Sequence, residues 1–151
     1  MADIQPFRAV RYNFDIAGDV SLHVCPPFDV ITPQLQHELY DRSPYNIVRL
    51  ELARRGLSDD PYERAAETSQ TWKDSGVLKH DEEPSIYVTE EEFEYRGRII
   101  RRRGFIAGVR LEDYDQKVVL PHEGTRSEWV ADRVRLMGAA QSNYSPLLVI
   151  Y

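Results

Sequence analysis

The order of hydrophobic and polar residues predicts three amphipathic helices. In each one, apolar or small residues recur at spacings of three and four, as they do on one face of a helix. The first helix begins at Pro33, with Thr32 as its N-cap, and turns Leu35 and Leu39 inward. The last helix runs from about residue 127 to residue 140.

The helix that follows Asp60 has the clearest pattern of the three. Asp60 and Glu63 form a capping box around Pro61, and Gly76 ends the helix. Its inner face is formed by residues at helical spacing, namely Tyr62, Ala65, Ala66, Ser69 and Trp72. The corresponding stripe of the last helix consists of Val130, Val134 and Met137, with Leu136 and Ala140 beside it. We expect both stripes to face the core.

Short extended segments predict strands between and beyond these helices. They are residues 7–12, 14–16, 45–52, 117–120 and 145–151. Residues 25–31 contain two prolines, which exclude a central strand there and favour a loop.

Residues 85–111 predict a long β-hairpin that turns at Arg96 and Gly97. With those two residues as the loop, three acidic residues oppose three basic ones: Glu90 with Arg103, Glu91 with Arg102, and Glu92 with Arg101. Opposite charges on facing strands stabilise a sheet. We therefore expect the arginine triplet to serve the hairpin, and direct binding of phosphate by the triplet is the disfavoured alternative.

Helices and strands are interspersed along the chain, with one long antiparallel hairpin. This order predicts an α+β fold with a mixed β-sheet, the hairpin and about three helices. The length of 151 residues suits one domain, and no repeat, low-complexity tract or long linker divides residues 1–151.

Composition and charge narrow the function classes. The net charge is −6 and the isoelectric point is near 5.2, which disfavours a uniformly basic nucleic-acid binder and a polybasic membrane-surface protein. Cys25 is the single cysteine, so no disulfide forms within the chain. The first ten residues lack the apolar core of a signal peptide, and no apolar run approaches the roughly 20 residues that span a bilayer. We therefore expect a cytoplasmic protein that does not bind membranes.

The segment before the last helix concentrates polar chemistry. It places His122, Glu123, Thr125 and Arg126 immediately ahead of Ser127. A helix start offers unpaired N–H groups to a phosphate, and an arginine and two hydroxyls would add donors. His122 and Glu123 suit a general acid and base, or two ligands of a hard metal ion. The alternative is structural: Thr125 or Ser127 caps the helix and Glu123 complements its dipole.

Other polar residues give weaker signals. Asp29 follows two prolines, and a stiff loop can present its carboxylate to a cleft; a turn-forming aspartate is the alternative. Asn46 has the same ambiguity at the end of another loop. Asp132 and Arg133, one turn into the last helix, form an exposed ion pair by default.

Short motifs in one order along the chain resemble a known family. They are Pro6-Phe-Arg-Ala-Val10, Pro26-Pro-Phe-Asp-Val-Ile31, Pro44-Tyr-Asn46, Val119-Leu-Pro-His-Glu-Gly-Thr125, Asp132-Arg133 and Ser145-Pro-Leu-Leu148. Over essentially the whole chain, they resemble the N-terminal part of the prokaryotic family called domain of unknown function 1015. Because members of that family are commonly much longer, the resemblance implies that this chain is the N-terminal part of a longer protein.

The resemblance also implies particular site residues. The family's His-Glu-x-Thr motif corresponds to His122, Glu123 and Thr125, and its Asp-Arg pair to Asp132 and Arg133. The resemblance carries no assigned activity.

Two positions depart from the family's pattern. Phe28 stands where the family has tyrosine, which removes a hydroxyl beside Asp29. Residues 129–131 are Trp-Val-Ala where members often have Lys-Glu-Asp, so fewer charges lie near the helix start.

A weaker resemblance, of the strand–polar segment–helix order, is to the ParB and sulfiredoxin-like group. In that group a short motif before a helix holds nucleotide phosphates, and some members are kinases of small molecules. The leading hypothesis is therefore a small-molecule or nucleotide phosphate site at residues 122–126 that faces Asp29. It would serve phosphoryl transfer or hydrolysis, with magnesium on Glu123 or Asp29. The alternative is a non-catalytic interaction domain that packs on the C-terminal portion of a longer protein.

Overall fold

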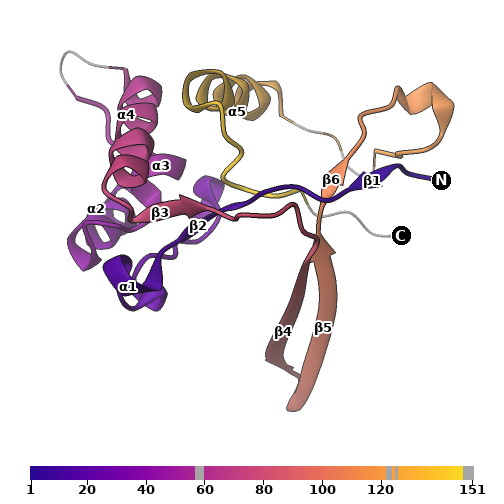
Figure 1. The fold of residues 1–151 in the computed structure, drawn as a ribbon, viewed down its shortest axis with the longest axis horizontal. Coiled ribbons are helices and arrows are strands. Elements are labelled where there is room, and N and C mark those ends of the chain that lie inside the picture. The colour runs from indigo at the N-terminus through magenta and orange to yellow at the C-terminus, as the bar shows by residue number, and fades with distance from the viewer. Residues whose placement is uncertain (57–59, 122–123, 125, 148–151) are drawn as a thin grey trace. The chain divides into compact units, whose positions relative to one another are not determined.

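The computed structural model describes residues 1–56, 60–121, 124 and 126–147, which belong to two units. Unit 1 comprises residues 1–10 and 80–124, and unit 2 comprises residues 11–79 and 125–151. Two of the three boundaries between the units fall within short strands, β2 (Val10–Tyr12) and β3 (Leu78–His80), which pair with each other (Figure 1).

Unit 1 contains two further two-stranded sheets. Strand β1 (Ile4–Gln5) pairs antiparallel with β6 (Gly108–Val109), and β4 (Tyr87–Tyr95) pairs antiparallel with β5 (Arg98–Ile106). A short 3-10 turn, η3 (Tyr114–Gln116), follows. At the base of the β4–β5 hairpin, the Tyr87 hydroxyl accepts from the Ala9 N–H at 2.9 Å and donates to Asp81 at 2.6 Å.

The hairpin expected from the charge pattern is confirmed in its register. Glu90 pairs with Arg103, Glu91 with Arg102 and Glu92 with Arg101, and all three pairs form ion pairs. Arg96 and Gly97 form the turn with φ of 51° and 72°. Two positive φ angles are what a two-residue type I′ hairpin loop requires.

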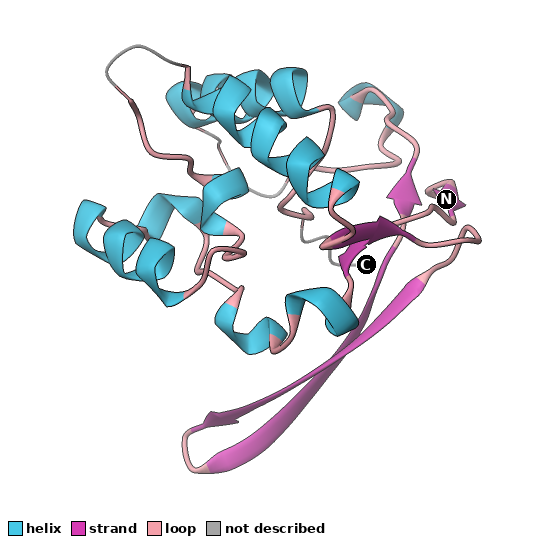
Figure 2. Ribbon diagram, turned by 60° about the vertical axis from the view of Figure 1, so that its left-hand side comes forward, coloured by secondary structure: helices cyan, strands magenta, loops and turns pink. Residues whose placement is uncertain are grey.

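Unit 2 is mainly helical (Figure 2). Its helices are α1 (Phe14–Ala17), α2 (Pro33–Arg42), α3 (Val48–Glu51), α4 (Pro61–Asp74) and α5 (Ser127–Ala140), and its 3-10 turns are η1 (Val20–Leu22) and η2 (Phe28–Val30). The expected N-caps are present: the Thr32 hydroxyl accepts from the Leu35 N–H at 3.2 Å, and Asp60 accepts from the Tyr62 N–H at 2.9 Å. Gly76 follows α4 with a φ of 75°, a conformation that glycine adopts without strain.

The described core lies in unit 2, where α4 packs against α3 and α5. Its buried apolar residues are Leu39, Val48, Leu50, Ala65, Trp72, Val77, Leu78, Leu136 and Ala140. Leu136 and Ala140 of α5 pack on Ala65 of α4, a small residue that lets the two helices approach closely. Within the described residues, no helix is long and apolar enough to cross a membrane.

The α+β class is confirmed, but several strand predictions are wrong. Residues 14–16 lie in α1, because Asn13 caps that helix and accepts from the Asp15 N–H. Residues 48–51 form α3, where the Asn46 amide oxygen accepts from the Val48 N–H and starts the helix. Residues 117–120 follow η3 without forming a strand, and residues 145–147 are not a strand either; residues 148–151 lie outside the described part. In place of one mixed sheet, the described strands form three two-stranded sheets.

The predicted inner stripe of α5 is also wrong. Val130, Val134 and Met137 are 45%, 61% and 47% exposed, whereas Leu136 and Ala140 are buried. Both sets have helical spacing, so the pattern alone cannot choose between them. Ala65 of α4 decides which of the two sets is buried, because its small side chain leaves room for Leu136 and Ala140.

Candidate functional site

The start of α5 lies beside the loop that carries Asp29. Phe28 and Trp129 meet edge to face, with ring centroids 6.1 Å apart and planes at 78°. The Arg126 guanidinium lies 4.6 Å from the centre of the Trp129 ring, and the Arg133 guanidinium lies 3.9 Å from the centre of the Phe28 ring. Two cations and two aromatic rings thus join the loop to the first two turns of α5.

Arg126 occupies the N-cap position of α5, and Ser127 is the first helical residue. No side chain among the described residues caps this helix start. The Arg126 carbonyl accepts from the N–H groups of Trp129 and Val130, both at 3.1 Å. The earlier N–H groups of a helix have no such partner within it. One alternative expected Ser127 to cap the helix. Ser127 is instead the first helical residue, one position after the N-cap.

Behind this start, Arg133 binds two carboxylates. Its Nε donates to Asp132 Oδ2 at 2.9 Å, and its Nη1 donates to Glu51 Oε1 at 3.0 Å and to the Glu51 carbonyl at 3.1 Å. Glu51 is only 4% exposed. The expectation of an exposed Asp132–Arg133 pair is wrong, because the Arg133 side chain is 22% exposed and bridges to a buried acid.

Two hydroxyls complete this network. Tyr62 donates to Asp132 Oδ1 at 2.6 Å, and Ser145 donates to Glu51 Oε1 at 2.5 Å. Burial alone raises the pKa of the Asp132 carboxyl, but the hydrogen bonds from Tyr62 and Arg133 outweigh it and hold that pKa below its usual value. The hydrogen bond to Asp132, followed by burial, raises the pKa of the Tyr62 hydroxyl.

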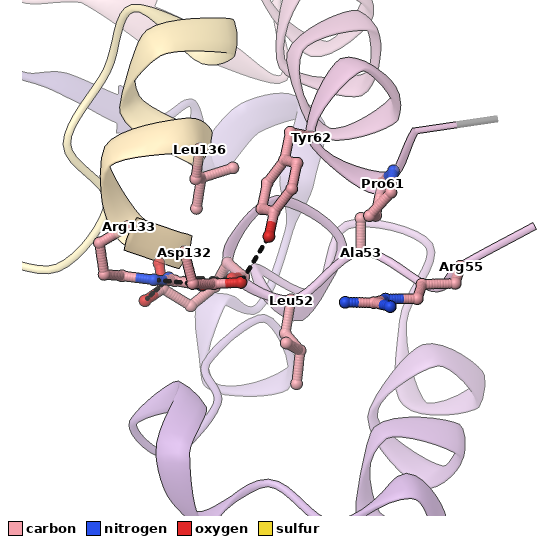
Figure 3. Close-up of a pocket in the computed structure, with 9 residues that line it drawn as sticks. Leu52, Ala53, Arg55, Pro61, Tyr62, Asp132, Arg133 and Leu136 are labelled. Carbon is pink, nitrogen blue, oxygen red and sulfur yellow. Dashed lines mark hydrogen bonds and ion pairs between the residues drawn. The ribbon is translucent and has the colours of Figure 1, made fainter. Parts of the chain in front are cut away.

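A small cavity of about 50 Å³ opens onto the network (Figure 3). It is lined by Glu51, Leu52, Ala53, Arg55, Pro61, Tyr62, Asp132, Arg133 and Leu136. The Tyr62 hydroxyl points toward Asp132 in this view. The volume suits one or two water molecules and is far below the several hundred Å³ of a typical ligand pocket.

The candidate residues from the sequence fall into three groups. Arg126, Ser127, Asp132 and Arg133 lie in the first two turns of α5, and Asp29 is an exposed residue of the neighbouring η2 turn. Asn46 is fully buried in backbone hydrogen bonds: it donates to the Leu22 and Val24 carbonyls and accepts from Val48. His122, Glu123 and Thr125 lie outside the described residues. The described residues contain no group of three or more His, Cys, Asp or Glu side chains that could hold a metal ion.

Sequence reasoning missed Glu51 and the role of Tyr62. Glu51 falls within residues 45–52, which the sequence predicts as a strand, and Tyr62 belongs to the predicted inner face of the helix after Asp60. Ser145 belonged to a family motif with no assigned role. The signal that links them is the Asp132-Arg133 motif, because a partly buried arginine needs acidic partners.

The family comparison covers nearly all of these residues. The model of the family described as "Protein of unknown function (DUF1015)" matches residues 4–151. The chain belongs to this family. No curated protein and no solved structure matches it. In this DUF1015 chain, the Pro-Pro-Phe-Asp, Asp-Arg and Ser-Pro-Leu motifs meet through Phe28, Arg133 and Ser145 around Glu51.

Proposed function

We propose that unit 2 binds a small anionic ligand, with phosphate as the recognised group, at the start of α5. Arg126, Thr125 and the backbone N–H groups near Ser127 would hold the anion. The observation that supports the proposal is the contact between Phe28 and Trp129, because Phe28 precedes Asp29 in the chain and Trp129 lies in the first turn of α5.

Charge and preorganisation both support an anion at this place. The 14-residue helix α5 directs the positive end of its dipole toward the start. Arg126 is exposed and forms no ion pair with any described residue, while its contact with Trp129 restricts its side chain. A guanidinium that is already positioned loses little entropy when it binds a phosphate.

The proposal extends to catalysis by His122, Glu123 and Asp29. A histidine and two carboxylates beside a bound phosphate would supply an acid, a base and oxygen ligands for magnesium, as phosphoryl transfer or nucleotide hydrolysis requires. The resemblance to the ParB and sulfiredoxin-like group, with its nucleotide-phosphate motifs, favours the same chemistry. A cytoplasmic location, where such phosphates are abundant, fits this proposal.

Calorimetry with inorganic phosphate and with ATP–magnesium tests the binding step. A charge-assisted hydrogen bond contributes about 1.5–3 kcal/mol, so Arg126→Ala should weaken binding roughly ten- to a hundredfold. Arg42→Ala is the matched control, because Arg42 is an exposed arginine at the end of another helix, α2. Equal affinities for Arg126→Ala and Arg42→Ala would refute the site.

Turnover of ATP tests the catalytic step separately. His122→Ala and Glu123→Gln should abolish hydrolysis or transfer while leaving phosphate affinity within a few-fold of wild type. If the wild type binds ATP without turning it over, the site is a binding site alone.

The alternative is a non-catalytic interaction domain, and the exposed stripe of Val130, Val134 and Met137 favours it. Apolar residues gathered on one helix face are typical of a surface that another chain segment covers. The C-terminal portion of a longer family protein would be the partner. When that portion is supplied separately, Val134→Asp should abolish its binding and leave phosphate affinity unchanged.

A further inference from the structure

The β4–β5 hairpin of unit 1 is a two-stranded sheet with no further strand on either edge in the described part of the chain (Figure 1). Nearly all of its residues are exposed. An isolated two-stranded hairpin is marginally stable in water, and stable sheets cover at least one face. The hairpin therefore has a surface to offer to a partner.

The two faces of the hairpin differ at its base. One face carries Tyr87, whose ring packs edge to face on Phe7 at 5.2 Å, so unit 1 covers that face in part. The opposite face is exposed from base to tip, with Val88 82% exposed. We name it the open face. It comprises Val88, Glu90, Glu92, Glu94, Ile99, Arg101, Arg103 and Phe105, because residues two apart and cross-strand partners share a face.

The arginines of the open face retain unused hydrogen-bond donors. Arg103 uses only its Nε on Glu90, at 2.6 Å, and Arg101 uses only its Nε on Glu92, at 2.8 Å. On the face that carries Tyr87, by contrast, Arg102 uses both Nε and Nη2 on Glu91. The Nη groups of Arg101 and Arg103 form no hydrogen bond with any described residue and can bind further carboxylates.

We propose that the open face docks on the open face of a second copy of this chain, about a two-fold axis parallel to the strands. This rotation places β4 of one copy over β5 of the other, with both turns at the same end. Val88 then lies over Phe105, Glu90 over Arg103 and Glu92 over Arg101 of the second copy. Apolar residues cover each other at the base, and each acidic residue gains a second arginine.

The charges exclude the other symmetric arrangements. A two-fold axis across the strands would place β4 over β4 and bring glutamates onto glutamates. Edge-to-edge pairing of β4 with β4, or of β5 with β5, would align the glutamate or arginine triplets. Of these arrangements, the one with the axis along the strands places glutamate over arginine in both charged rows, whereas Glu94 lies over Ile99 in the row nearest the turn.

The expected dimer is weak. One face of a hairpin of nine-residue strands is smaller than the roughly 800 Å² per partner of a standard interface. We therefore expect dissociation constants on the order of micromolar or weaker, and the concentration series should extend to about a millimolar.

A charge-swapped hairpin tests the proposal without removing its internal ion pairs. The variant Glu90→Arg, Glu92→Arg, Arg101→Glu and Arg103→Glu keeps opposite charges within each hairpin and remains complementary to itself. It is not complementary to wild type, because the glutamates of wild-type β4 would lie over the glutamates that the variant carries on β5. Each protein should dimerise in sedimentation velocity, while heterodimers in native mass spectra of a mixture should be depleted about tenfold relative to homodimers.

The matched control swaps the exposed pair on the face that carries Tyr87, Glu91→Arg with Arg102→Glu. It should form heterodimers with wild type at the statistical proportion. Val88→Glu is an independent test. It should weaken the wild-type dimer and leave the circular dichroism spectrum unchanged. A wild type that stays monomeric across the whole concentration series, or statistical mixing with the four-residue swap, would overturn the proposal. Neither outcome bears on phosphate binding at α5, which lies in unit 2.

Discussion

Replacing Arg133 by methionine should destabilise unit 2 strongly, because it leaves the carboxylate of Glu51 buried without its cation. Arg133 Nη1 lies 3.0 Å from Glu51 Oε1, and Glu51 is 4% exposed. Removing one partner of a buried ion pair costs about 3–5 kcal/mol. Since the Arg133 side chain is 22% exposed, water reaches the pair in part, and we expect about 3 kcal/mol.

Urea unfolding followed by far-ultraviolet circular dichroism measures this loss. The control is Arg135→Met on the same helix, where an exposed arginine pairs with Asp60 at 3.1 Å, and it should cost less than about 1 kcal/mol. Adding Glu51→Gln to Arg133→Met should recover more than half of the loss, because no buried charge is then left unpaired. If Arg133→Met and Arg135→Met differ by less than about 1 kcal/mol, the buried charge does not govern stability as argued.

Three further predictions concern the packing around the site. Burial and the negative charge of Glu51 raise the pKa of the Cys25 thiol to about 11. The rate of its alkylation by iodoacetamide should therefore keep rising up to that pH, and a rate that levels off near pH 9 would contradict this. Because folding favours the neutral thiol, the free energy of unfolding should fall as the pH rises from about 8.5 toward 11, and Cys25→Ser should flatten that decline in urea titrations. Asn46→Ala should lower the free energy of unfolding by about 2–3 kcal/mol, because it leaves buried backbone groups without hydrogen-bond partners. Asp60→Ala should lower it by about 1 kcal/mol through the loss of an N-cap, and urea midpoints compare the two variants.

Local signals in the sequence predicted the parts of the fold that local physics decides. The caps at Thr32 and Asp60 set the starts of α2 and α4, and the bounds of α5 agree with its predicted range. The hairpin register followed from three charge pairs and a two-residue turn, all within one continuous segment. In each case the interacting groups lie close together along the chain.

Predictions failed where a distant side chain or a short local bond decides the structure. Residues 45–52 alternate well enough for a strand, but the Asn46 side chain, anchored to the Leu22 and Val24 carbonyls, starts a helical turn instead. The face of α5 was misassigned because Ala65, on another helix, selects which stripe is buried. Neither effect is visible in the periodicity of the segment concerned.

The candidate site also combines residues that the sequence could predict with a residue that it could not. Asp29, Arg126 and Ser127 could be chosen from their chemistry and their position beside a helix start, but the residue that organises the site could not. Glu51 is separated from Arg133 by 82 positions and has no motif around it. Its burial is stable only because Arg133 and Ser145 arrive from other segments. A site at the start of α5 would depend on this buried network, since Arg133 also fixes the Phe28 ring against which Trp129 packs, and Trp129 in turn holds Arg126.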